Sequence, residues 1–125
     1  MKSTVSHKNY QTMVMLAYQK KYPKHRIWNQ PTGYAYMIDS VKAALKLAFM
    51  GKMTEAKKRL RMIFFGNIGC ADISGLTDEG IRIEIEIKVG NDRQRKEQKT
   101  FEEMIKKLNG IYKLVDDKSP IEDQI

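Results

Sequence analysis

The fold is decided by a strand-like stretch in the second half of the chain. Residues 81–88 read IRIEIEIK, with an isoleucine at every second position and a charged residue at each position between. Successive side chains of a β-strand point to opposite faces of the sheet, so this pattern predicts a strand with one apolar and one charged face. Residues 70–75 (CADISG) predict a shorter strand, and the turn residues 78–80 predict that the two strands pair as a hairpin.

The first part of the chain predicts a helix and a second short strand. Apolar residues recur at helical spacing and predict an amphipathic helix over residues 6–21, which ends before Pro23. The residues of this stripe are Tyr10, Met13, Val14 and Ala17. We expect the stripe to lie on the sheet. Residues 26–29 predict a short strand, and we expect its Trp28 to belong to the core.

The last part of the chain predicts a helix, a strand and a tail. Apolar spacing predicts a helix over residues 93–108, and the apolar segment 111–115 predicts a final strand. Residues 116–125 are polar and are expected to form a loose tail. Together with 125 residues and 42% hydrophobic content, these elements predict a single α/β domain with a mixed sheet flanked by helices.

Residues 37–61 predict a basic pair of helices ahead of the hairpin. Asp39 or Ser40 can cap the first helix, and Gly51 is a natural end for it. The first helix should bury one face, which consists of Val41, Ala44, Leu45 and Ala48. The second helix should run from Thr54 to about Arg61, and the apolar run MIFF at 62–65 predicts an extended segment.

The net charge of +8 favours a polyanionic partner, and nucleic acid is the first candidate. Residues 1–38 contain no Asp or Glu, which random scatter of lysine on solvated helix faces does not explain. A membrane surface is the competing partner. However, no segment approaches the roughly 18 apolar residues of a spanning helix, and residues 1–4 have no apolar signal-peptide core, so we expect a cytoplasmic protein.

Cysteine usage excludes two classes of site. Cys70 is the one cysteine of the chain, so an intrachain disulfide and a multi-cysteine zinc site are both excluded. We expect Cys70 to be a small buried hydrophobe in a strand.

Asp72, Glu86 and Lys88 form the strongest candidate site. Acids from the two strands of a hairpin can converge on one divalent cation, because Mg²⁺ prefers carboxylate oxygens and keeps waters for a phosphate and a nucleophile. Lys88 lies two residues after Glu86 and therefore on the same face. The alternative is that Glu84, Glu86 and Lys88 only make salt bridges on an exposed strand face. Asp72 argues against it, because an acid in such an apolar strand needs a partner.

These motifs, in this order, resemble a nuclease family. The chain has Gly69 to Gly75 (GCADISG), then Ile85 to Lys88 (IEIK), then Gln98 in a helix that ends at Gly110 and runs into the strand. This arrangement resembles the virus-type replication-repair nuclease (VRR-NUC) domain of the PD-(D/E)XK superfamily. The resemblance covers most of the chain and implies a restriction-endonuclease-like core with a central mixed sheet, in which residues 37–61 are a helical insertion before the active-site hairpin.

The resemblance implies a role for each residue of the site. Asp72 and Glu86 would be metal ligands together with the backbone carbonyl of Ile87, Lys88 would be the catalytic lysine, and Gln98 would face the site from the following helix. The family cleaves phosphodiester bonds in DNA with Mg²⁺ or Mn²⁺. Its small phage and bacterial members are similar to dimeric junction-resolving enzymes, which implies a homodimer acting on branched DNA in replication, recombination or repair.

The chain departs from the family in its first helix. The family usually supplies a further acid there, near a glutamine that Gln11 matches, but no acid precedes Asp39. His7 occupies the approximate position. Either His7 is a substitute ligand or water-orienting group, or the site works with two acids, or His7 is a surface histidine with neither role.

Basic residues supply candidate DNA contacts. A predicted helix start carries Arg93, Arg95 and Lys96, although free backbone N–H groups there favour anions over cations. Either these cations bind a phosphate, or they are solvated charges that the helix tolerates. Asn29 lies in a segment that resembles the family's tryptophan-and-asparagine motif. Lys57, Lys58 and Arg59 are candidates to hold a second duplex arm.

Two other functions remain open at this stage. The first is a non-catalytic nucleic-acid-binding module that uses the same basic residues, with its acids serving only in salt bridges. The second is a toxin-like or regulatory protein with an acidic protein partner, for which the sequence contains no motif.

Overall fold

The computed structural model describes residues 5–31, 33–65 and 68–125, and it divides into two compact units. The core unit consists of Met1–Gln30 with Ile68–Ile125, and the inserted unit consists of Pro31–Asn67. Residues 1–4, on which the expectation about a signal peptide rests, lie outside the described residues, as do residues 32, 66 and 67.

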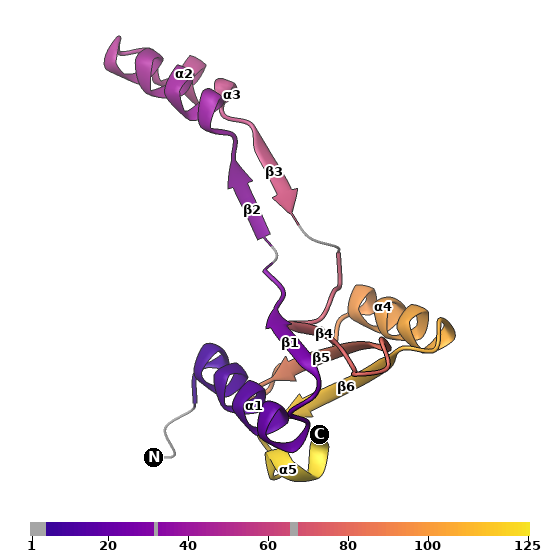
Figure 1. Ribbon diagram of the computed structural model, residues 1–125. Helices are drawn as coiled ribbons and strands as arrows, with labels where there is room; N and C mark the ends of the chain where they lie inside the picture. The colour runs from indigo at the N-terminus through magenta and orange to yellow at the C-terminus, as the bar shows by residue number, and fades with distance from the viewer. Residues whose placement is uncertain (1–4, 32, 66–67) are drawn as a thin grey trace. The chain divides into compact units, whose positions relative to one another are not determined.

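A four-stranded mixed sheet forms the centre of the core unit (Figure 1). Its strands, in spatial order, are β1 (Arg26–Asn29), β4 (Ile73–Leu76), β5 (Arg82–Lys88) and β6 (Ile111–Asp116). The pairs β1–β4 and β4–β5 are antiparallel, whereas β5–β6 is parallel. The predicted hairpin is therefore confirmed, as is the mixed α/β class with helices flanking the sheet.

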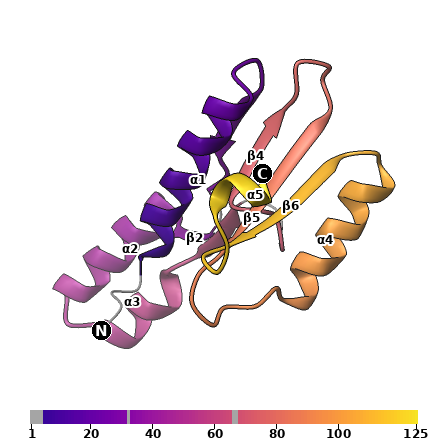
Figure 2. The same cartoon turned by 90° about the horizontal axis from the view of Figure 1, so that it is seen from below.

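Helices cover both faces of this sheet (Figure 2). α1 (His7–Lys21) and the short α5 (Ile121–Gln124) lie on one face, and α4 (Lys96–Lys107) lies on the other. The α1 side holds the larger apolar cluster, in which the isoleucines of β5 pack against α1. The α4 side holds a small cluster built from Ala71, Phe101 and Ile105. The apolar core is thus concentrated on one side of the sheet.

α1 begins as the sequence predicts but buries a shifted stripe. Ser6 caps the helix, since its hydroxyl accepts a hydrogen bond from the Asn9 backbone N–H. Tyr10, Val14 and Tyr18 are buried, whereas Met13 is exposed, so the expectation for Met13 was wrong. Residues four apart form one ridge along a helix, and Met13 lies about 100° around the helix from the centre of this ridge.

The C-terminal residues 116–125 are ordered, so the expectation of a loose tail was wrong. The Gln124 side chain accepts a hydrogen bond from the Asp116 backbone N–H and donates one to the Asp116 carbonyl. Ile125 is buried in the apolar cluster under α1. A single apolar residue at the end of a polar segment gives no periodic pattern, which is why the sequence did not predict this packing.

Two further core assignments were wrong. Trp28 is 40% exposed, because β1 is an edge strand with three of its four residues exposed. Cys70 is half-buried and precedes β4, which begins at Ile73, so it does not lie in a strand. It packs at the margin of the small cluster under α4.

The inserted unit contains two strands and two helices. β2 (Gly33–Tyr36) and β3 (Met62–Phe65) form an antiparallel ribbon, and α2 (Ile38–Phe49) and α3 (Met53–Arg59) lie between them in sequence. The helical pair and the extended 62–65 segment are confirmed, whereas β2 was not predicted.

Three details of α2 differ from the sequence prediction. Met37, rather than Asp39 or Ser40, occupies the cap position of the helix. The Ser40 hydroxyl donates to the Met37 carbonyl instead. Leu45 is 53% exposed although it was expected on the buried face.

None of the helices in the described ranges is long and apolar enough to cross a membrane.

Candidate active site

The charged face of β5 is buried beneath α4. Glu84, Glu86 and Lys88 are 0%, 2% and 6% exposed, so they do not form a solvent-exposed ladder of salt bridges. Their alternation with isoleucine sends them all to the face opposite α1, as the sequence predicts. Burial of ionisable groups is costly unless they are paired or hydrogen-bonded. The partners of these side chains therefore decide what the face can do.

Gln98 connects the acid and the lysine of β5. Its side-chain N–H donates to Glu86 Oε1 at 2.9 Å, and its Oε1 accepts from Lys88 Nζ at 2.9 Å. Gln98 is itself fixed, because the Arg95 backbone N–H donates to the same Oε1 at 2.8 Å at the start of α4. Lys88 Nζ also lies 3.4 Å from Glu86 Oε1 and 3.4 Å from an oxygen of Asp92. Four side chains thus form one polar cluster.

Asp72 approaches the same strand from the segment that precedes β4. Its Oδ2 accepts a 2.8 Å hydrogen bond from the Ile87 backbone N–H. This bond fixes the carboxylate next to Glu86 and Lys88, between which Ile87 lies. The Asp72 side chain is 26% exposed, whereas that of Glu86 is 3% exposed. Asp72 therefore lies where the cluster meets solvent.

Gly69 allows the Asp72 segment to pass close to α4. Its φ of +76° is a conformation that favours glycine, and an added Cβ would lie 2.3 Å from the Glu97 carbonyl oxygen. The chain can approach the first turn of α4 this closely only without a side chain at 69. Gly69 thus helps to place Asp72 and Gln98 beside the same strand.

Glu86 has an unmet requirement for a partner. Its Oε2 is buried and makes no hydrogen bond among the described residues. Burial, as the larger cause, and the nearby Asp72 carboxylate together raise the pKa of the Glu86 carboxyl to about 8, although Lys88 acts in the opposite direction. A buried carboxylate with a free oxygen beside a second carboxylate favours either a proton or a cation.

His7 and Gln11 extend from α1 to the same place. His7 Nε2 lies 3.2 Å from the Ile87 carbonyl oxygen and 3.5 Å from Asp72 Oδ2. Gln11 Nε2 donates to the Asp72 carbonyl at 3.3 Å and to Asn29 Oδ1 at 2.7 Å. The structure therefore brings both helix residues and Asn29 to the edge of the site, and His7 is not an isolated surface histidine.

The basic candidates fall into two groups. Arg93, Arg95 and Lys96 are exposed and precede or begin α4, close in sequence to Gln98. The predicted helix over 93–108 begins only at Lys96, so Arg95 is its cap residue. Lys57, Lys58 and Arg59 form the last turn of α3 in the inserted unit, which is a separate compact unit.

The structure adds two groups that sequence reasoning missed. Glu84 accepts hydrogen bonds from Ser74 Oγ at 2.8 Å and from Arg82 Nε at 2.6 Å, so this buried acid is paired. Asp92 interacts with Lys88 across the turn that follows β5. The strict alternation of β5 already places Glu84 on the face of Glu86, but no sequence signal indicates its pairing with Ser74.

The available donors fit a hard divalent cation. Asp72 and Glu86 offer carboxylate oxygens, and the Ile87 carbonyl lies on the same stretch of strand. Oxygen donors of this kind suit Mg²⁺ or Mn²⁺, which retain water ligands where the protein supplies few groups. Within residues 5–31, 33–65 and 68–125, no group of three or more His, Cys, Asp or Glu side chains is arranged to hold a metal. A cation here would therefore depend on the two acids, the carbonyl and water.

Comparisons with protein-family models, with curated proteins and with solved structures give no match, so the site is interpreted from its own geometry.

Proposed function

We propose that this chain is a metal-dependent DNA endonuclease with a restriction-endonuclease-like core of the VRR-NUC type. The observation that carries the proposal is Glu86, a buried carboxylate beside Asp72 and Lys88, of which one oxygen has no partner among the residues that the structure describes. Two nearby carboxylates repel each other unless a proton or a cation is bound. Mg²⁺ or Mn²⁺ would resolve that repulsion.

Asp72, Glu86 and the Ile87 carbonyl would hold the cation. When bound, Mg²⁺ or Mn²⁺ supplies Lewis acidity at the phosphate and lowers the pKa of a coordinated water. The hydrogen bond from the Ile87 N–H keeps the Asp72 carboxylate in position, and Gln98 keeps Glu86 in position. The oxygen ligands are thus oriented by groups on β5 and α4.

Lys88 and Gln98 would act on the reacting groups. The Lys88 ammonium, aligned by Gln98 and Asp92, would position the attacking water and offset the negative charge that builds on the phosphate. Gln98 would orient water or the scissile phosphate through the amide that faces the site. His7, within 3.5 Å of Asp72, would serve in place of the missing helix acid as a water-orienting group.

DNA is the proposed substrate because the chain carries a net charge of +8. Asn29, Arg93, Arg95 and Lys96 would contact the phosphate backbone next to the site, and Lys57, Lys58 and Arg59 would do so from the inserted unit. The resemblance implies that the substrate is branched or junction DNA and that the enzyme is a homodimer. It would act in the cytoplasm of a bacterium or of a phage-infected host. Two related sites would serve symmetric cleavage.

The decisive experiment compares cleavage of labelled four-way junctions, flaps, splayed arms, duplex and single strands with Mg²⁺. We expect Asp72→Asn, Glu86→Gln and Lys88→Met to lower the cleavage rate by more than about 100-fold, since each removes a group at the reacting centre. Glu79→Gln, an exposed acid in the turn before β5, is the matched control and should cut normally. Folding of each variant is checked by circular dichroism.

Two outcomes would overturn the proposal. If folded Asp72→Asn and Lys88→Met proteins cut DNA as well as the wild type does, the proposed active site is wrong. A wild-type protein that binds DNA with a salt-dependent affinity but neither cuts it nor binds Mn²⁺ in an electron paramagnetic resonance titration would instead be a binding module. The Mn²⁺ titration thus separates the two functions without relying on the choice of DNA.

A further inference from the structure

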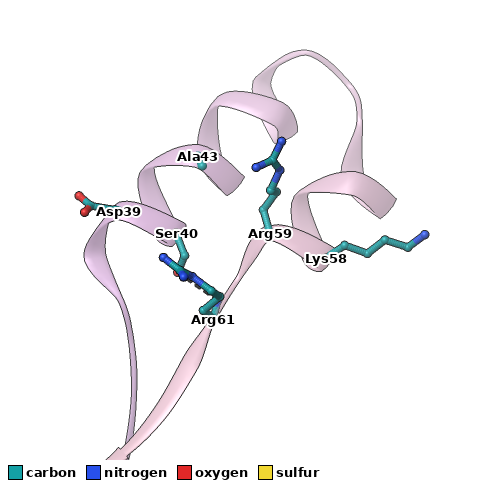
Figure 3. Close-up of a pocket in the computed structure, with 6 residues that line it drawn as sticks. All are labelled: Asp39, Ser40, Ala43, Lys58, Arg59 and Arg61. Carbon is teal, nitrogen blue, oxygen red and sulfur yellow. Dashed lines mark hydrogen bonds between the residues drawn. The ribbon is translucent and has the colours of Figure 1, made fainter.

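A second candidate site lies within the inserted unit. A cleft of about 470 Å³ opens between α2, α3 and the residues that lead into β3 (Figure 3). Its lining is polar and mainly cationic, and consists of Asp39, Ser40, Ala43, Lys58, Arg59 and Arg61. All of these residues belong to one compact unit, so the cleft does not depend on how the two units are arranged.

The cations of this cleft lack acidic partners. No ion pair joins Lys58, Arg59 or Arg61 to an acid in the described parts of the chain. Figure 3 shows the Asp39 carboxylate directed away from both guanidinium groups, and the Lys58 ammonium directed away from the cleft. The charged groups at this cleft are therefore the guanidinium groups of Arg59 and Arg61.

Arg61 is held in place by its backbone. Its N–H donates to the Ser40 hydroxyl at 3.0 Å, and its carbonyl accepts from the Met37 N–H at 2.9 Å. Ser40 is 5% exposed and donates in turn to the Met37 carbonyl at 2.6 Å. The start of α2 thus fixes the backbone from which the Arg61 side chain extends, so ligand binding does not have to order that backbone.

Helix stability alone does not explain this pair of arginines. Cations in the last turn of a helix interact favourably with its dipole, which accounts for Arg59 at the end of α3. Arg61 lies two residues beyond the end of the helix, where the effect of the dipole falls off, so the dipole accounts less well for a second guanidinium there. Two guanidinium groups at one cleft match the oxygens of a phosphate group.

We propose that this cleft binds a phosphate of the DNA backbone, separately from the active site and without a divalent cation. The inference rests on the proposed function only for the identity of the polyanion as DNA. Both arginines are exposed, which suits an extended polymer better than a small metabolite enclosed in a pocket. The inserted unit would then hold the DNA while the core unit cuts it.

The test measures DNA affinity in EDTA, so that cleavage and metal binding play no part. We expect Arg59→Gln/Arg61→Gln to lower the affinity by about tenfold and to reduce the slope of log affinity against log salt by about 2. Lys42→Gln/Lys52→Gln is the matched control, because it removes the same charge from exposed positions of the same unit outside the cleft. The control should change the slope by less than half as much.

A conservative pair guards against misfolding. Arg59→Lys/Arg61→Lys keeps the charge but removes the two-pronged donor, so we expect the salt slope to stay near that of the wild type while affinity falls. The proposal would be overturned if the cleft variant and the control variant lost equal DNA affinity. It would also be overturned if the Arg59→Lys/Arg61→Lys protein bound DNA as tightly as the wild type does. Competition by inorganic phosphate or a mononucleotide at micromolar concentration would also overturn it in favour of a small ligand.

The failure of this proposal and the failure of the nuclease function give different results. Glu86→Gln should bind DNA in EDTA like the wild type and fail to cut it. The cleft variant should cut at the normal maximal rate but need more DNA to reach that rate. Normal cutting by Glu86→Gln with weakened binding by the cleft variant would reject the active site and leave the cleft in place.

Discussion

The two faces of β5 are equally buried but opposite in chemistry. Ile83, Ile85 and Ile87 are fully buried against α1, whereas Glu84, Glu86 and Lys88 are buried beneath α4. Burying an aliphatic side chain contributes about 1.5–3 kcal/mol to stability. Taking a charge out of water costs free energy, which only an ion pair or hydrogen bonds can offset. One strand thus serves the core on one side and carries ionisable groups on the other.

This difference agrees with the face on which we propose the active site. Stability alone favours apolar side chains on both sides of a central strand, as in many buried sheets. Glu84 is satisfied by Ser74 and Arg82, but Glu86 keeps an oxygen without a partner in the described structure. Acids with a strongly perturbed pKa are common at binding and catalytic sites, which supports the proposed function.

The largest effect should come from the apolar face. Ile85→Ala removes a fully buried side chain from the centre of the α1 cluster and leaves a cavity, so we expect a loss of about 2–5 kcal/mol in the free energy of unfolding. Urea denaturation followed by circular dichroism measures it. A loss below 1 kcal/mol would show that this face is not the main core.

A smaller effect should come from the satisfied acid of the other face. Ser74→Ala removes the hydroxyl that donates to Glu84, and a hydrogen bond to a charged group contributes about 1.5–3 kcal/mol. The same denaturation measures it, and cleavage by the folded variant should be unchanged. A loss of cleavage without a loss of stability would place Glu84 inside the active site.

The most gradual effect is a pH dependence that isolates Glu86. Because its pKa is raised from 4.5 to about 8 in the folded protein, the folded state binds a proton that the unfolded state has already released within this range. The free energy of unfolding should therefore fall as pH rises through this window, by at most about 1.4 kcal/mol per pH unit from this group.

Glu86→Gln should remove this decline. In chelator-treated protein, the free energy of unfolding of the variant should rise relative to that of the wild type as pH increases towards 8. Above pH 8 the difference between the two should stay constant. Glu79→Gln should follow the wild-type curve. Parallel curves for Glu86→Gln and the wild type would show that burial does not disfavour the Glu86 charge.

Most elements of the core unit could be predicted because their signals are local. The alternation in β5 fixes which residues share a face, and turn residues fix the hairpin with β4. The placement of Asp72, Glu86, Lys88 and Gln98 in one cluster agrees with the expectation from the ordered motifs. Their roles in metal binding and cleavage stay predictions.

What could not be predicted depends on contacts between distant segments. Alternation cannot tell an exposed charged face from one covered by α4, so the burial of Glu86 came only from the structure. The pairing of β2 with β3, the packing of Ile125 under α1 and the exposure of Trp28 on an edge strand also depend on tertiary neighbours. Local propensity carries little information about such positions.

The place of the inserted unit in the chain bears on how such a protein can change. β1 and β4 are adjacent antiparallel partners, with Asn29 opposite Ile73, so residues 31–67 occupy the loop of a hairpin. A hairpin loop tolerates replacement because its length has only a weak effect on the entropy of closing it. One inserted unit could therefore be exchanged for another, in evolution or by engineering, with every strand pairing of the core unit preserved.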